Sequence, residues 1–365
     1  MHSRVDKLVE RFDEFGIDGF LLVPPPQTMN SIPNVFYLTG FTGSNAVLII
    51  TAGRRLFLTD TRYVEMAQAN VKGFEVIENT TRPLHELFPE LNKDLGITKL
   101  GVESATLSLA LYNKWKDAFA PVELVPTEGA VEKLRMLKDE YELEAIRNAI
   151  RVNEETFRHL LGCIKDGVRE NEIAAEFEYQ IRKRGAKMAS FPPIIASGTN
   201  SSMPHAGYTT QEIVPGAPFT IDIGVVYDGY CSDMTRTVFF KDCPKVWRDR
   251  YEAVLDAKNA ATAYAKAGMT GNEVDAIARS LIEGRGFTEH CYTHGLGHSV
   301  GIQIHEAPRF AKGNEDIVPA GCVMSIEPGI YVPGEGGIRI EDLVLVQENG
   351  LVNLNSLGTE LTVVG

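Results

Sequence analysis

Two kinds of hydrophobic spacing alternate through the first part of the chain. Short apolar runs, which are typical of buried strands, occur at GFLLV, NAVLIIT, RRLFLTD, FEVIEN, KLGVES and PVELVP. Helical spacing appears in the opening segment up to Gly16, at RYVEMAQAN and at TLSLALYNKWKDAFA. This alternation predicts an α/β domain over residues 1–126.

The pattern changes near Pro126. A stretch of about 40 residues from Glu128 has helical spacing, dense charge and no proline, so we place a domain boundary just before it. A chain of 365 residues also exceeds the size at which a single hydrophobic core stops growing. We therefore expect a second domain over residues 127–365.

An internal repeat organises this second domain. Residues 167–185 (GVRENEIAAEFEYQIRKRG) align without a gap with residues 268–286 (GMTGNEVDAIARSLIEGRG), and each copy predicts a helix that ends at a glycine. Thr270 and Glu273 add a capping-box pattern. Further along, IVPGAPFTIDIG aligns with IVPAGCVMSIEPG, which sets Asp222 opposite Glu327 on equivalent strands. The duplication predicts two halves that each present a carboxylate to a shared centre.

Each of these carboxylates is followed by turn residues and a second acidic side chain. Asp228 and Gly229 predict a hairpin that returns Asp233 toward Asp222. In the other half, the glycine-rich turn of EPGIYVPGEGGIRIED predicts a second hairpin, which returns Glu341 toward Glu327. Four converging carboxylates are costly to desolvate unless they neutralise cations, and two divalent ions with a bridging hydroxide nearly cancel their charge.

Three of the eight histidines lie in the stretch THGLGHSVGIQIHE, where His298 is the candidate imidazole ligand of such a di-metal site. A zincin motif is excluded, because the glutamate of HExxH is missing and two glycines disfavour a helix. His298 and His305 would face opposite ways on an unbroken strand. A bend at Gly301 is therefore needed to bring both into one cavity.

Composition limits the partners and the compartment. Against 49 Asp and Glu there are 36 Lys and Arg, and the net charge of −13 disfavours nucleic acid and anionic membranes. No apolar run approaches the ~20 residues of a membrane helix, and the N-terminus does not resemble a signal peptide. Five scattered cysteines without a CxxC pair indicate reduced thiols, so we expect a cytoplasmic protein.

The segments PHAGYT, DIGVVYDGYCSDMTRT, HGLGHSVGIQIHE, SIEPGIY and GIRIED carry a resemblance to the creatinase/aminopeptidase "pita-bread" family. Within it, the second domain is similar to the Xaa-Pro peptidases, which are prolidases and proline-specific aminopeptidases. YLTGFTGSNAVLIIT and TDTRYVEMA resemble the N-terminal lobe of prolidases. The resemblance implies an α+β protein with a pita-bread catalytic domain of duplicated helix-hairpin halves, a smaller creatinase-like α/β domain, and a homodimer.

The resemblance also implies a ligand set for two divalent ions. Asp222 would bind the first metal, Asp233 and Glu341 would bridge both, and His298 and Glu327 would complete the second. Oxygen and imidazole ligands suit Mn²⁺ or Co²⁺, with Zn²⁺ and Fe²⁺ as alternatives. The implied activity is hydrolysis of the Xaa-Pro bond at the free N-terminus of dipeptides or short peptides, by a metal-bridging hydroxide with Glu327 as general base.

Further residues receive roles from the same resemblance. His205 and His305 would approach the substrate as catalytic side chains, and His294 would border the pocket. Arg309, in HEAPRF, would hold the free carboxylate of a dipeptide, which favours a dipeptidase slightly over an aminopeptidase. Arg339 is assigned from its position instead: it lies two residues before Glu341 and shares its strand face, so it would either orient the metal-binding carboxylates or form an ordinary structural salt bridge.

Three other functions stay open. A broader aminopeptidase or a metal-dependent lyase could use the same scaffold, and lack of activity on Xaa-Pro substrates would favour either of them. A catalytically silent binding module is the alternative outside enzymes, and failure to bind any divalent ion would favour it.

Overall fold

The computed structural model describes residues 3–23 and 32–365 and divides into two compact units, Met1–Arg135 and Met136–Gly365. The division falls somewhat later than the boundary predicted at residue 126. Strand β6 (Glu123–Thr127) still pairs with β5 (Lys99–Glu103), and buried Arg135 donates a hydrogen bond of 2.7 Å to Asn34 Oδ1 within the first unit.

The first unit has the predicted α/β character. Its six strands form one mixed sheet in the order β4 (Glu75–Glu78), β3 (Arg55–Thr59), β2 (Val47–Thr51), β1 (Gly19–Leu22), β5 and β6. The helices are α1 (Arg4–Val9), α2 (Phe12–Phe15), α3 (Pro33–Thr39), α4 (Val64–Asn70), α5 (Leu84–Leu95) and α6 (Leu109–Ala118). All six apolar runs that predicted strands are strands.

Two helices of this unit were not expected from the sequence. Helix α3 is buried over most of its length, so it has no polar face to produce a helical pattern. Helix α5 contains Pro89, which is normally a helix breaker. The opening helical segment is in fact two short helices, and it ends as predicted at Gly16, whose φ of 63° favours glycine.

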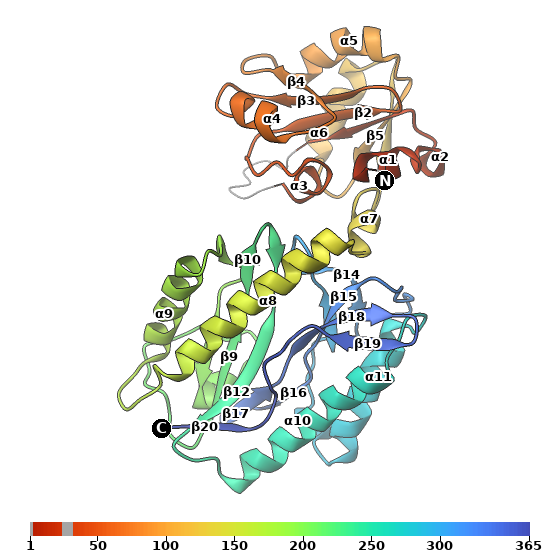
Figure 1. Cartoon of the computed structure of the whole chain (residues 1–365). Coiled ribbons are helices and arrows are strands. Elements are labelled where there is room, and N and C mark those ends of the chain that lie inside the picture. Colours follow the sequence, from red (N-terminus) through yellow and green to blue (C-terminus); the bar gives the residue numbers. More distant parts are fainter. Residues whose placement is uncertain (1–2, 24–31) are drawn as a thin grey trace. The chain divides into compact units, whose positions relative to one another are not determined.

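In the second unit the sequence repeat is a structural duplication (Figure 1). One half has helices α8 (Glu140–Leu161) and α9 (Glu170–Lys183) beside a sheet in the order β20 (Thr362–Val364), β12 (Met234–Phe240), β9 (Pro218–Ile223) and β8 (Ile194–Ser197). The other has α10 (Lys245–Tyr264) and α11 (Gly271–Gly284) beside a sheet in the order β14 (Glu306–Phe310), β13 (Gly297–Ser299), β15 (Val323–Ile326), β18 (Asp342–Gln347) and β19 (Gly350–Asn353). The predicted α+β pita-bread architecture is confirmed.

Local signals explain where the helices of this unit begin and end. The capping box is present at α11, where Thr270 Oγ1 accepts from the Glu273 backbone N–H and the Glu273 carboxylate accepts from the Thr270 N–H. The long helical stretch after Glu128 is two helices: α7 (Glu132–Met136), which spans the division between the units, and α8, which Asp139 caps. In the described part of the chain, no helix is both long and apolar enough to span a membrane.

Strand pairing brings the predicted carboxylates back to the same level of each sheet. Asp222 on β9 pairs with Thr235 on β12, and Asp233 directly precedes β12. In the other half Ile326 pairs with Asp342, which places Glu327 and Glu341 side by side at the ends of β15 and β18.

Both predicted hairpins are confirmed. The first joins β10 (Val225–Tyr227) to β11 (Tyr230–Cys231) and forms a three-stranded sheet with β7 (Met188–Ala189). Its turn residues Asp228 and Gly229 have φ of 48° and 83°, the geometry that favours an Asp-Gly pair. The second joins β16 (Gly329–Val332) to β17 (Gly336–Arg339).

Candidate active site

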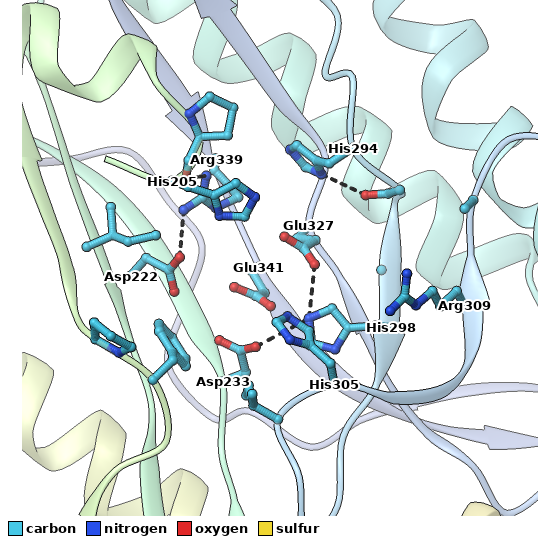
Figure 2. A pocket seen from close by; sticks show the side chains of 18 of the residues that line it. His205, Asp222, Asp233, His294, His298, His305, Arg309, Glu327, Arg339 and Glu341 are labelled. Carbon is cyan, nitrogen blue, oxygen red and sulfur yellow. Dashed lines mark hydrogen bonds and ion pairs between the residues drawn. The ribbon is translucent and has the colours of Figure 1, made fainter. Parts of the chain in front are cut away.

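A cavity of about 560 Å³ lies in the second unit and is lined by residues of both halves (Figure 2). All ten residues predicted for the site line this one cavity: His205, Asp222, Asp233, His294, His298, His305, Arg309, Glu327, Arg339 and Glu341. The lining also contains apolar residues that the sequence analysis did not identify, among them Phe191, Pro192 and Ile304.

The centre of the cavity is a compact group of metal-binding atoms. Ligand atoms of Asp233, His298 and Glu341 all lie within 4.8 Å of one another. His298 Nε2 is 3.6 Å from Asp233 Oδ2 and 3.4 Å from Glu327 Oε1. Its other nitrogen, Nδ1, is 3.3 Å from the Ser299 carbonyl oxygen, so an Nδ1–H donated there leaves the Nε2 lone pair free. Burial lowers the pKa of His298 to about 3, which keeps this imidazole neutral.

The acidic side chains of the cavity repel one another. Burial and the carboxylate of Glu341 raise the pKa of Asp233 well above its usual value, and burial and Glu327 do the same for the pKa of Glu341. Burial raises the pKa of Glu327 to about 7, although Arg339 opposes this shift. Such a group is stabilised when cations enter it.

Two buried carboxylate oxygens, Asp222 Oδ1 and Glu341 Oε1, have no hydrogen-bond donor among the described residues. Buried acceptors without donors are costly in a folded protein unless another group satisfies them. Carboxylate oxygens together with one neutral imidazole are the ligands that divalent cations of the manganese-to-zinc series accept. The residues present therefore fit a divalent metal centre.

Arg339 is buried and connects several groups around this centre. Its guanidinium donates to Asp222 Oδ2 at 2.6 Å and to Thr235 Oγ1 at 3.2 Å. The Thr235 hydroxyl donates in turn to Glu341 Oε2 at 2.6 Å. Arg339 thus contacts one predicted ligand directly and reaches another through a threonine, an arrangement that restricts the orientation of both carboxylates.

Tyr331 is a residue of the site that the sequence analysis missed, although it lies in the quoted segment SIEPGIY. Its hydroxyl accepts from Arg339 at 2.7 Å and lies 3.1 Å from His294 Nε2. Burial lowers the pKa of His294 to about 4, and its Nδ1 lies 2.7 Å from the Gly295 carbonyl oxygen. His294 is therefore neutral, donates from Nδ1 and accepts the tyrosine hydroxyl at Nε2.

His298 and His305 face each other, with ring centroids 4.4 Å apart. The bend expected at Gly301 is a complete chain reversal, because β13 and β14 pair antiparallel with Ser299 opposite Glu306. A Cβ on Gly301 would lie 2.6 Å from the Glu306 carboxylate, so a larger residue at this turn would have to displace that side chain.

His205 occupies the matching place in the other half. It follows β8 and the short 3₁₀ helix η1 (Gly198–Ser202), just as His305 follows β13, and β8 and β13 flank the equivalent strands β9 and β15. The duplication therefore presents the matched pair His205 and His305, one from each half, to the cavity, as Figure 2 shows.

A fully buried carboxylate organises the segment that carries His205. Glu170, the first residue of α9, has no exposed surface. Its carboxylate accepts five hydrogen bonds of 2.6–3.0 Å, from Ser197 N, Asn200 Nδ2, Thr209 N, Thr209 Oγ1 and Gln211 Nε2. These donors lie on both sides of His205 along the chain, so Glu170 holds the ends of its loop together.

Replacing Glu170 with glutamine is expected to disturb this loop, because the new amide N–H groups would face donors. We expect a loss of about 1–3 kcal/mol in the free energy of unfolding, and with it a lower kcat/KM for the peptide hydrolysis that the resemblance implies. Urea denaturation and steady-state kinetics measure the two effects. Glu178→Gln, on the same helix but outside this network, is the control, and equal behaviour of the two variants would contradict the prediction.

The chain matches the metallopeptidase family M24 over residues 144–348 and the creatinase/prolidase N-terminal domain over residues 4–137. It is 35% identical over 364 residues to the Xaa-Pro dipeptidase of Pyrococcus furiosus, covering 99% of this chain and 100% of that relative. An Xaa-Pro dipeptidase from Bacillus anthracis has the same fold, with a TM-score of 0.92, 37% identity and 99% coverage of both chains. An X-Pro aminopeptidase from Thermotoga maritima also has this fold, with a TM-score of 0.91, 34% identity and 100% coverage of both chains.

The duplicated fold and its group of carboxylates and imidazoles define a metal-dependent hydrolase of the pita-bread type. The chain belongs to metallopeptidase family M24 and is an enzyme of that family, with the creatinase-like N-terminal domain that the resemblance implied.

Proposed function

We propose that this enzyme hydrolyses Xaa-Pro bonds at the free N-terminus of dipeptides or short peptides, with two divalent ions, Mn²⁺ or Co²⁺, in the cavity. The observation that carries the proposal is the grouping of Asp233, His298 and Glu341 within 4.8 Å, with Glu327 beside them. Asp222, held by Arg339, would complete the five ligands. Relatives named as Xaa-Pro dipeptidases and an X-Pro aminopeptidase support the substrate class.

Different residues of the cavity carry out proton transfer and substrate binding in this reaction. When bound, divalent ions make water nucleophilic at neutral pH and polarise the scissile carbonyl. Glu327, a carboxylate that lines the cavity, accepts the proton of the attacking water and transfers it to the nitrogen of the leaving proline. His205 and His305 contact the substrate from opposite halves. His294 borders the pocket, and its Nε2 lies 3.1 Å from the Tyr331 hydroxyl.

The apolar residues Phe191, Pro192 and Ile304 in the lining of the cavity would favour a proline ring. An Xaa-Pro bond has no N–H, so a site that recognises the amide hydrogen of ordinary peptides cannot select it. A proline ring instead gains from contact with an apolar surface.

Hydrolysis of three peptides by metal-stripped protein reloaded with Mn²⁺ or Co²⁺ tests this function. We expect cleavage of an Xaa-Pro dipeptide or an Xaa-Pro-Yaa tripeptide, no cleavage of an Xaa-Ala control, and loss of activity when the metal is removed. Inactivity on both proline peptides with metal bound would favour a broader aminopeptidase or a lyase. Failure to bind divalent ions would favour a binding module.

Arg309 decides between the two peptide classes. Its exposed side chain lines the cavity, where it would pair with the free carboxylate of a dipeptide. For Arg309→Ala we expect kcat/KM on the dipeptide to fall about tenfold and kcat/KM on the tripeptide to stay close to wild type. Arg309→Lys is the control that keeps the charge. Equal loss on both peptides would assign Arg309 to another role.

A homodimer is part of the proposal, on the strength of the family resemblance. Sedimentation equilibrium tests it, and a monomer at assay concentrations would remove it.

A further inference from the structure

Three metal-binding side chains meet outside the active-site cavity, where helices α8 and α9 pack together. His159 lies in the last turn of α8, Cys163 follows just after that helix, and Glu176 projects from α9. Their ligand atoms all lie within 4.8 Å of one another. None of the three residues lines the cavity described above.

The geometry of this group is convergent. His159 Nε2 is 2.6 Å from Glu176 Oε1 and 3.7 Å from Cys163 Sγ, so one ring nitrogen faces both partners. A nucleophilic triad would need the thiol and the carboxylate on opposite ring nitrogens. Three potential ligand atoms within 4.8 Å of one another are instead close enough for one metal ion to bind them together.

The distances approach those of tetrahedral coordination. Bonds of about 2.3 Å to sulfur and about 2.0 Å to nitrogen or oxygen place sulfur and nitrogen about 3.5 Å apart, and nitrogen and oxygen about 3.3 Å apart. The sulfur–nitrogen distance already agrees. The nitrogen–oxygen pair, now 2.6 Å apart, must open by about 0.7 Å. The side chains have room for this movement because they remain 37% and 33% exposed.

Partial exposure also leaves a fourth position for water. Gln180 Nε2 donates to Glu176 Oε1 at 2.7 Å and fixes the orientation of the carboxylate from outside the group. We propose that His159, Cys163 and Glu176 form a second metal site on this enzyme, for a thiophilic divalent cation such as Zn²⁺.

The chemistry of the thiol distinguishes this site from the cavity. Burial, with a contribution from Glu176, raises the pKa of Cys163, so its sulfur is a protonated thiol at neutral pH. Metal binding replaces the S–H bond with an S–metal bond and releases the proton to solvent. The predicted ligands in the cavity are oxygens and imidazole only, whereas this site has a thiolate, which selects Zn²⁺ over Mn²⁺.

Cadmium is the probe, because a Cd²⁺–thiolate bond has an ultraviolet charge-transfer band that oxygen and imidazole ligands do not produce. We would titrate Cd²⁺ into the full-length, Mn²⁺-loaded enzyme and into its variants. The band is expected in wild type at one equivalent and in Cys291→Ser, which removes another partly buried thiol. It should be absent in Cys163→Ser. In His159→Ala the Cd²⁺ affinity should fall at least ~tenfold, because removing even a residue that only hydrogen-bonds to a ligand lowers metal affinity by that factor.

Three results would overturn the proposal. The first is the absence of a band in wild type, or a band unchanged in Cys163→Ser. The second is a band lost only in Cys231→Ser, which would place the thiolate two residues from Asp233. The third is a Cys163-dependent band whose Cd²⁺ affinity is the same in wild type, His159→Ala and Glu176→Gln, which would indicate an adduct of a single thiol. The band needs no peptide hydrolysis, so this test is independent of the proposed function.

Discussion

Replacing Glu327 with glutamine is expected to lower kcat on an Xaa-Pro substrate by about 10³-fold, the middle of the range for loss of a general base. The amide keeps the size of the side chain and can still accept from Ser325 Oγ, which lies 3.1 Å from Glu327 Oε1. It cannot accept and return a proton. Steady-state kinetics with metal-loaded protein measures the effect.

Because Glu327 is also a proposed ligand, the metal content of the variant must be measured by elemental analysis. A large loss of kcat with full metal content assigns the proton-transfer role to Glu327. The same loss with metal missing assigns only the ligand role. Glu348→Gln, on an exposed turn, is the control and should behave as wild type. A Glu327 variant that kept wild-type kcat would exclude this residue from the mechanism.

Replacing Arg339 with methionine is expected to weaken divalent-metal binding by about 10–100-fold, the usual cost of removing a group that orients ligands. Without the guanidinium, Asp222 Oδ2 loses a donor at 2.6 Å and Thr235 loses the contact through which Arg339 reaches Glu341. Competition with a chelator of known affinity measures the change. Unfolding in urea shows separately how much stability is lost.

A matched variant separates the orienting role from an ordinary salt bridge. Arg279 is also largely buried and is paired with a carboxylate, Asp275, at 2.7 Å, but neither residue lines the cavity. Arg279→Met should lower the free energy of unfolding and leave metal affinity unchanged. If Arg339→Met behaves in the same way, Arg339 is only a structural partner of Asp222.

Local patterns were sufficient for much of the secondary structure. Strands β1 and β2 of the first unit appear as apolar runs because they are buried at successive positions, which requires apolar side chains on both faces of the sheet. The hairpin at Asp228 and Gly229 follows from the positive φ that this turn demands. Helices α3 and α5 were not predicted. Burial on most sides removes the amphipathic pattern of α3, and the internal proline of α5 argues locally against a helix.

The candidate site was accessible from the sequence because the domain is duplicated. A repeat with acids at matching positions makes convergence far more plausible than an isolated Asp or Glu would, and the ten predicted residues do line one cavity. Tyr331 and Thr235 could not be found in this way. Their importance lies in hydrogen bonds to Arg339 across strands far apart in the chain.

The sequence by itself determined the class of architecture, the duplication and the chemical types of the site residues, because periodicity, turn residues and repeats act over short distances along the chain. Only the tertiary structure decided which atoms meet. It directs Arg339 to Asp222, reverses the chain at Gly301 so that His298 and His305 face each other, and brings His159 and Glu176 together from different helices. These contacts depend on strand register and helix packing, which are set by long-range burial and leave no local pattern.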